Sequence, residues 1–113
     1  MIDTTAIVKE VSTDLARKLK DLGEDVSTNT LNIIVKTAVR EVIAKREYPE
    51  SMSEEDILAD LDNYYSTIFH VAEYDYNLIG AEGQESHSEN GVNRKYVDRN
   101  SLFNNVFTYV RFF

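Results

Sequence analysis

The chain has no cysteine and no tryptophan, and it has only one proline and four glycines among its 113 residues. Without cysteine there are no disulfides, thiolate metal ligands or thiol nucleophiles, so a stable core must come from side-chain packing alone. No apolar run approaches the roughly 20 residues that cross a bilayer, and residues 1–10 lack the basic start and apolar core of a signal peptide. We therefore expect a cytosolic protein with no membrane contact.

Basic residues are missing from the middle of the chain. Residues 1–46 hold eight basic and seven acidic side chains, whereas residues 47–90 hold twelve acidic side chains and no Lys or Arg. Duplex DNA binding normally needs a basic stripe, so a chain with net charge −8 and this acidic centre is poorly equipped to grip DNA. It would let DNA pass without sticking, unless the acidic run is simply a solvated helix face.

The remaining composition is that of a folded protein. Hydrophobic residues make up 42% and charged residues 28%, which is ordinary for a globular chain. At this length we expect one domain over residues 1–113, because a chain of this size has too little surface left to bury for a second core.

Apolar residues recur every three or four positions over residues 5–22, which predicts an amphipathic helix that ends at Gly23. Capping oxygens over residues 24–29 begin a second helix, whose apolar stripe runs to about residue 46. The Tyr48-Pro49 pair closes it, since the residue before a proline is displaced from helical geometry.

The third predicted helix is the longest. Ser53 begins a capping box with Asp56 at its last position, and no breaker follows until Gly80, so the helix is expected over residues 53–79, roughly 39 Å at 1.5 Å per residue. Its apolar side chains fill about half of the circumference, which predicts that one partner element cannot cover them. The expected packing positions are Leu61, Tyr65, Ile68, Ala72 and Ile79.

Asp75 falls near the middle of that apolar arc, where an unpaired carboxylate is costly to bury. One interpretation is an ion pair across a protein interface, with Arg94, Lys95 or Arg99 as the cation. The other is that the helix end frays and Asp75 reaches water.

Ser101 is expected to cap a short C-terminal helix and tail over residues 101–113, which is apolar except on one narrow face. Its apolar excess, ending in Phe112 and Phe113, predicts a contact surface. The fold class that follows is all-α: a small elongated bundle of about four helices with one long central helix.

Residues 80–96 carry three of the four glycines. They lack the Gly-Lys-Ser/Thr of a phosphate loop, which argues against nucleotide binding. His87 lies between Glu85 and Glu89, but a solvent-exposed histidine is the simpler interpretation than a metal ligand. No catalytic spacing is present, so we expect no enzyme activity, no cofactor and no metal.

Asn90-Gly91 is a strong two-residue turn signal, with short polar segments on both sides. It predicts a loop or β-hairpin arm over residues 80–96. Such a hairpin has too few apolar side chains to be stable alone, so it would order only against another surface.

The order of these features resembles the head-tail connector (adaptor) family of tailed bacteriophages. The resemblance covers roughly residues 29–109: Tyr48-Pro49, a long helix ending near Tyr76, then Gly80-Ala81-Glu82-Gly83, Ser86-His87-Ser88-Glu89-Asn90-Gly91-Val92 and Arg94-Lys95-Tyr96 before a short terminal helix. It is most specific in the loop. Residues 109–113 depart from the family pattern in being more aromatic.

The resemblance implies a structural virion protein at the head-tail interface, assembled in the host cytoplasm. It implies a homo-oligomeric ring, typically of twelve subunits, that contacts the portal protein, extends the channel through which DNA passes, and offers a docking surface to the next neck protein or tail component. By this hypothesis Asp75 is a polar interface candidate, and the subunit or portal contacts are Gly83, Ser86, His87, Ser88, Asn90, Gly91, Val92, Arg94, Tyr96, Phe107, Phe112 and Phe113.

Other functions stay open at this point. An acidic DNA mimic or inhibitor would bind a DNA-handling protein through the acidic run. A small metal-dependent hydrolase would use His87, Glu85 and Glu89. Within phage necks, a stopper or tail terminator is a further alternative, although those proteins tend to be richer in β-structure.

Overall fold

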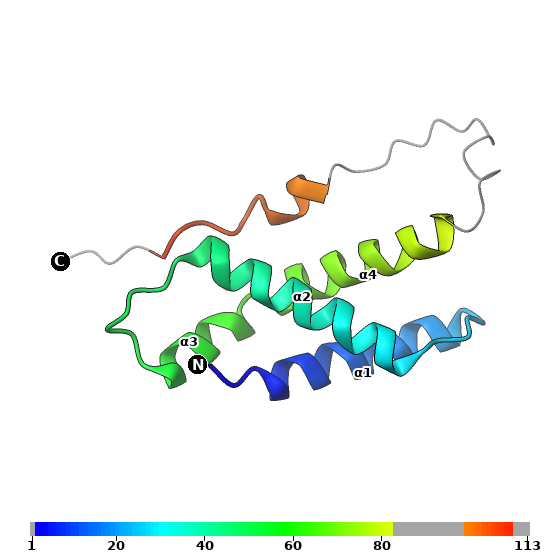
Figure 1. The fold of residues 1–113 in the computed structure, drawn as a ribbon, viewed down its shortest axis with the longest axis horizontal. Coiled ribbons are helices and arrows are strands. Elements are labelled where there is room, and N and C mark those ends of the chain that lie inside the picture. The colour runs from blue at the N-terminus through cyan, green and yellow to red at the C-terminus, as the bar shows by residue number, and fades with distance from the viewer. Residues whose placement is uncertain (1, 83–98, 110–113) are drawn as a thin grey trace.

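The computed structural model describes residues 2–82 and 99–109, and in these ranges the chain is a bundle of α-helices with no strand (Figure 1). The all-α prediction is therefore confirmed. The helices are α1 (Thr5–Asp21), α2 (Thr28–Arg46), α3 (Glu54–Asp62) and α4 (Tyr65–Glu82), followed by the 3₁₀ helix η2 (Arg99–Phe103).

The first two helices begin and end close to the predicted positions. Gly23 follows α1 with a φ of +85°, a conformation that glycine adopts without steric cost. The Ser27 hydroxyl caps α2 by accepting a hydrogen bond from the Thr30 amide at 3.3 Å. Glu47 ends α2 in the left-handed region, with a φ of 46°.

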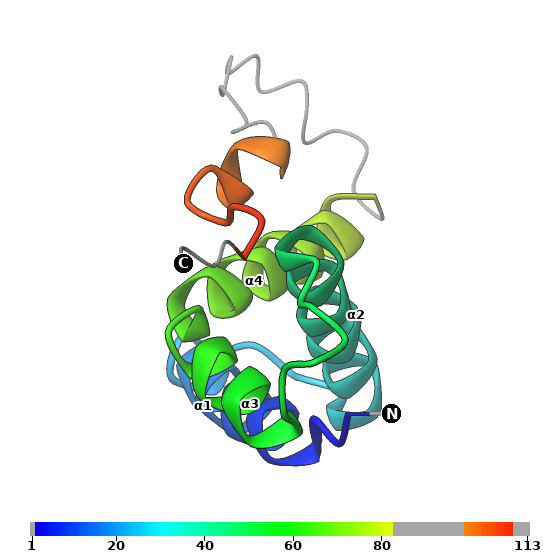
Figure 2. The same ribbon diagram turned by 90° about the vertical axis from the view of Figure 1, so that its left-hand side faces the viewer.

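The single long helix predicted over residues 53–79 was wrong. Ser53 does cap its start, but the helix stops at Asp62 and a new one begins at Tyr65, and the two do not share an axis (Figure 1, Figure 2). The amides of Asn63 and Tyr64 bond to carbonyls three residues back, at 3.0 and 2.8 Å, which tightens the last turn and ends the α-helical ladder.

The prediction that one partner element cannot cover the apolar arc holds for α4, which packs against α1, α2 and η2 of the same chain. Because α3 and α4 are oriented independently, Ile57 and Leu61 of α3 and the middle of α4 each face the bundle, where they are buried. Within the described part of the arc only Leu78 and Ile79 are exposed.

The core is one cluster contributed by all four helices and the C-terminal segment. Its largest fully buried side chains include Leu15, Leu31, Leu61 and Ile68. Three of the expected packing positions, Leu61, Ile68 and Ala72, are fully buried, while Ile79 is 49% exposed.

The predicted C-terminal helix over residues 101–113 is wrong for its described part. The chain forms η2 at Arg99–Phe103, and residues 106–109 follow without helical structure. Phe103 and Val106 are buried in the core, and the Tyr109 amide donates to the Arg46 carbonyl at 2.6 Å. These contacts favour an extended segment over a further helical turn, and we call residues 104–109 the C-terminal strap.

Gly80 does not end the preceding helix, since α4 continues to Glu82. The predicted arm over residues 80–96 therefore begins inside a helix, and its remainder, residues 83–96, lies outside the described residues.

Candidate interaction surfaces

Arg46 holds the end of α2 to α3 and to the C-terminal strap. Its Nε and Nη2 donate to the two carboxylate oxygens of Asp60, both at 2.9 Å, and its Nη1 donates to the Phe107 carbonyl at 2.9 Å. The Arg46 and Asp60 side chains are only 11% and 15% exposed. A two-point pair in such surroundings fixes both orientation and distance.

Three tyrosine rings surround this pair. The Arg46 guanidinium lies 5.8 Å from the ring centre of Tyr48 and 5.0 Å from those of Tyr64 and Tyr109. The Tyr48 hydroxyl donates to Asp60 at 2.7 Å. Burial raises the pKa of Tyr48, and its hydrogen bond to Asp60 raises the pKa further, so the phenol remains a neutral donor.

Arg99 forms a second cluster, which holds η2 to α2 and α4. Its Nε and Nη2 donate to Asp75 at 2.8 and 2.7 Å, and its Nη1 and Nη2 donate to Glu41 at 2.9 and 2.6 Å. Hydrogen bonds to Asp75 and to Glu41 raise the pKa of Arg99 above its ordinary value. Of the three cations considered for Asp75, the structure places Arg99 on it, within the same chain.

The Arg99 cluster is more open to solvent than the Arg46 cluster. The side chains of Arg99, Glu41 and Asp75 are 30%, 33% and 22% exposed. Arg99 is also the first described residue after residues 83–98, so this cluster fixes the start of the described C-terminal segment.

Two polar contacts join α1 to α4. The Tyr65 hydroxyl donates to the Asp14 carboxylate, and Lys18 Nζ lies 2.6 Å from Glu73. Burial and the hydrogen bond to Asp14 raise the pKa of Tyr65 to about 12.

Exposed apolar side chains gather at the end of the bundle where α4 ends. Leu78 and Ile79 lie on the last turns of α4, and Leu22, 66% exposed, lies in the loop between α1 and α2. The Tyr76 hydroxyl donates to the Asp25 carbonyl at 3.4 Å, which ties α4 to that loop. Both segments reach the same end of the molecule in Figure 1.

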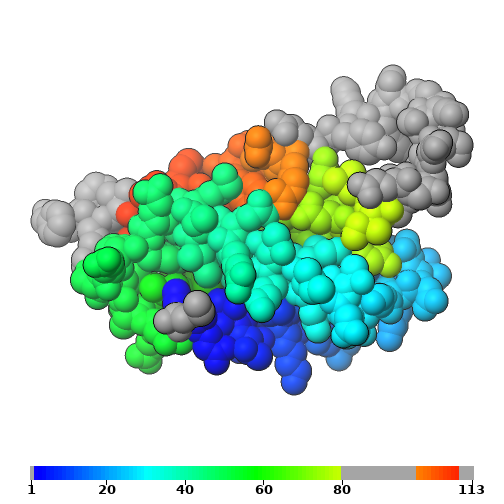
Figure 3. All heavy atoms as spheres, in the orientation of Figure 1, coloured from blue at the N-terminus to red at the C-terminus, as the bar shows by residue number. Residues whose placement is uncertain are grey.

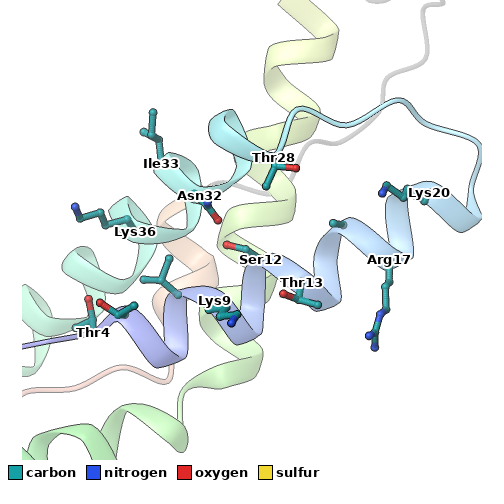
Figure 4. Close-up of a pocket in the computed structure, with 13 residues that line it drawn as sticks. Thr4, Lys9, Ser12, Thr13, Arg17, Lys20, Thr28, Asn32, Ile33 and Lys36 are labelled. Atoms are coloured by element: carbon teal, nitrogen blue, oxygen red, sulfur yellow. The ribbon is translucent and has the colours of Figure 1, made fainter.

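A groove of about 830 Å³ runs between α1 and α2, which form adjoining bands on one face of the molecule (Figure 3). Four cations and no carboxylate line it. Ser12 lies between the two helices (Figure 4), and its buried hydroxyl has no hydrogen-bond partner among the described residues. The lining residues are Thr4, Thr5, Val8, Lys9, Ser12, Thr13, Ala16, Arg17, Lys20, Thr28, Asn32, Ile33 and Lys36.

Most of the expected interface residues fall outside the described ranges. Phe107 is described and is 67% exposed, and Asp75 pairs with Arg99. The expected contacts that lie outside are Gly83, Ser86, His87, Ser88, Asn90, Gly91, Val92, Arg94, Tyr96, Phe112 and Phe113, and so do the alternative metal ligands Glu85 and Glu89.

In the ranges 2–82 and 99–109, no group of three His, Asp or Glu side chains is placed to hold a metal ion. In the same ranges, no helix is both long and apolar enough to cross a membrane.

Sequence reasoning missed the groove and the Arg46 cluster. Lys9, Arg17 and Lys20 recur on α1 at helical spacing, which was a usable signal for a basic face. The Arg46 cluster joins residues 46, 60, 64 and 109, and no local pattern in the sequence connects positions so far apart.

Comparisons of this chain with protein-family models, with curated proteins and with solved structures found no match.

Proposed function

We propose that this chain is a structural protein of a tailed-phage neck, a head-tail connector that forms a ring beneath the portal. The ring, dodecameric by resemblance, extends the DNA channel and offers the docking surface for the next neck protein or the tail. The chain acts as an assembly subunit, not as an enzyme, and it ends up in the virion.

One observation carries this proposal: the connector-like motif over residues 80–96 begins on the last turn of α4, beside exposed Leu78 and Ile79, and its far end leads into the Arg99 cluster. In the sequence, polar, glycine-rich residues that cannot build a core thus connect the exposed apolar turn of α4 to the Arg99 cluster. Apolar patches of this kind are typical of protein contacts.

The exposed acidic side chains fit a channel role. Glu47, Glu50, Glu55, Asp56 and Asp62 form no ion pair within the described residues and are exposed. Carboxylates repel DNA phosphates, so a ring surface that carries them would let DNA slide without binding it.

Mixing the purified chain with isolated portal of the same virus, followed by particle imaging, tests this proposal. We expect added ring density at one end of the portal. Portal particles that look the same with and without the chain, in conditions where filled heads are stable, would contradict the connector role.

The same exposed acidic side chains favour one alternative, an acidic DNA mimic or inhibitor that binds a DNA-handling protein. That function predicts a salt-dependent complex with a basic partner. It also predicts a monomer or dimer with no affinity for portal, so the imaging experiment separates the two functions.

A further inference from the structure

The α1–α2 groove has an unusual charge environment for this protein. The chain as a whole has a net charge of −8, yet Lys9, Arg17, Lys20 and Lys36 line the groove and no carboxylate does. None of these four cations forms an ion pair within the described residues. They are free to pair with an acidic group from outside the molecule.

The floor of the groove also contains a buried polar group without a hydrogen-bond partner among the described residues. Ser12 is buried, with 6% of the residue exposed, and its Oγ has no partner among the described residues. A buried hydroxyl without a partner costs free energy, which a ligand that supplies a donor or acceptor recovers. Exposed Ile33 and partly buried Val8 and Ala16 add apolar surface beside it.

We infer that this groove receives the outer face of α3 from a second copy of this chain. Glu55, Ala59 and Asp62 lie at positions i, i+4 and i+7 of α3, and all three are exposed. Two carboxylates therefore flank a small apolar side chain on one helical face. That face complements a groove with cationic edges and an apolar floor.

The spacing of the charges is compatible with this arrangement. Glu55 and Asp62 are separated along the α3 axis by about 10 Å, and Lys9 and Arg17 along the α1 axis by about 12 Å. Side chains of Lys, Arg and Glu are long enough to absorb the difference.

The division of charge disfavours a contact between two grooves. Such a contact would place four cations against four cations, whereas a contact between the groove and α3 places cations against carboxylates. Contacts between two different surfaces build rings when the rotation closes. The inference thus rests on the ring proposed above, and names the subunit contact within it.

The test uses three double variants of the full chain. The groove variant is Lys9→Glu with Arg17→Glu, and the helix variant is Glu55→Lys with Asp62→Lys. The control is Arg40→Glu with Lys45→Glu, which changes the charge of α2 by the same amount outside the groove lining. Each variant is mixed with isolated portal, and the copies bound per portal are counted by native mass measurement.

We expect the groove variant and the helix variant to lose at least tenfold in copies bound when tested alone, and the control to bind as wild type. An equal mixture of the two should recover wild-type binding, because each reversed groove then meets a reversed α3. Such recovery also demonstrates that both variants are folded.

A groove variant that binds in full number, or a mixture that fails to recover, overturns the inference and leaves the connector role standing. In that case the groove serves another ligand, such as an acidic segment of the portal or a small anion. If wild-type chain does not bind portal at all, the connector role itself fails, and this subunit contact fails with it.

Discussion

The two arginine clusters fasten the same C-terminal segment at two points, but they differ in burial. Arg46 and Asp60 lie under three tyrosine rings at the α2–α3 end, with 11% and 15% of their side chains exposed. Arg99 shares its guanidinium between two carboxylates and is 30% exposed. When a mostly buried ion pair is broken, the remaining charge is poorly solvated and destabilises the fold. When a more exposed pair is broken, water screens the remaining charge.

This difference distinguishes the two clusters. The Arg46 pair is mostly buried, whereas the Arg99 cluster is partly open to solvent, and its Asp75 precedes the exposed Leu78 on α4 by one turn. We therefore expect the Arg99 contacts to break more easily than the Arg46 contacts. The predictions that follow test this contrast.

The largest effect is expected from Arg46→Ala. Removing this side chain leaves the mostly buried Asp60 carboxylate without its cation and removes a packing partner from three tyrosines, so the free energy of unfolding should fall by about 3 kcal/mol, the lower end of the range for fully buried pairs. Urea unfolding followed by circular dichroism measures it. Arg40→Ala, an exposed position on the same helix, is the control; a loss at Arg46 no larger than at Arg40 would show that the cluster does not stabilise the fold.

Arg99→Ala should cost less, about 1–2 kcal/mol, because water screens the two carboxylates that remain. The loss should be local, with faster amide hydrogen exchange over residues 99–109 and little change in α1 and α2. Adding Asp75→Asn should restore part of the stability, since Glu41 and Asp75 both contact Arg99 Nη2 and repel each other once it is removed. Equal protection changes throughout the bundle would contradict a local role for the Arg99 cluster.

Alkaline pH should weaken the contact between α1 and α4. The pKa of Tyr65 is about 12 in the fold, above its ordinary value of 10.0, so the neutral phenol is favoured in the folded state. Its contribution is fully present below pH 10 and is lost as the pH rises through about 12. Tyr65→Phe should therefore flatten the fall in stability over this range in pH-dependent thermal unfolding; an unchanged slope would mean that Tyr65 does not titrate differently in the two states.

The smallest effect is expected from Ser12→Ala. It removes a buried hydroxyl that has no partner among the described residues and substitutes a better helix former, so the free energy of unfolding should rise by about 1 kcal/mol. Thermal unfolding checks the sign, with Thr13→Ala as a neighbouring exposed control. A destabilised Ser12→Ala protein would mean that the hydroxyl does make a stabilising contact.

The local features of the fold were predictable from sequence, and the long-range ones were not. Ser27, Ser53 and Gly23 act through neighbours within a few residues, so capping and turn chemistry located them. No glycine or proline lies at the break after Asp62, so the local sequence did not predict it. The break depends on how α3 and α4 each pack against the core. The apolar arc was predicted to need more than one partner element; it is divided between α3 and α4 and is covered by several elements of the same chain.

In the C-terminal strap, too, long-range contacts outweigh the local sequence pattern. Residues 101–109 have a helical apolar pattern, but burying Phe103 and Val106 and bonding Tyr109 to the end of α2 outweigh it. Asp75 was recognisable as a carboxylate in need of a cation, and Arg99 was among three candidates for it. Glu41, which completes that cluster, lies 58 residues away and gave no signal.

The mass of the complex between this chain and isolated portal tests the connector role most directly. We predict a discrete complex that carries many copies of the chain per portal, in a number that forms a closed ring. Portal that keeps its own mass at every concentration of added chain, with the chain itself remaining a single copy, would contradict it.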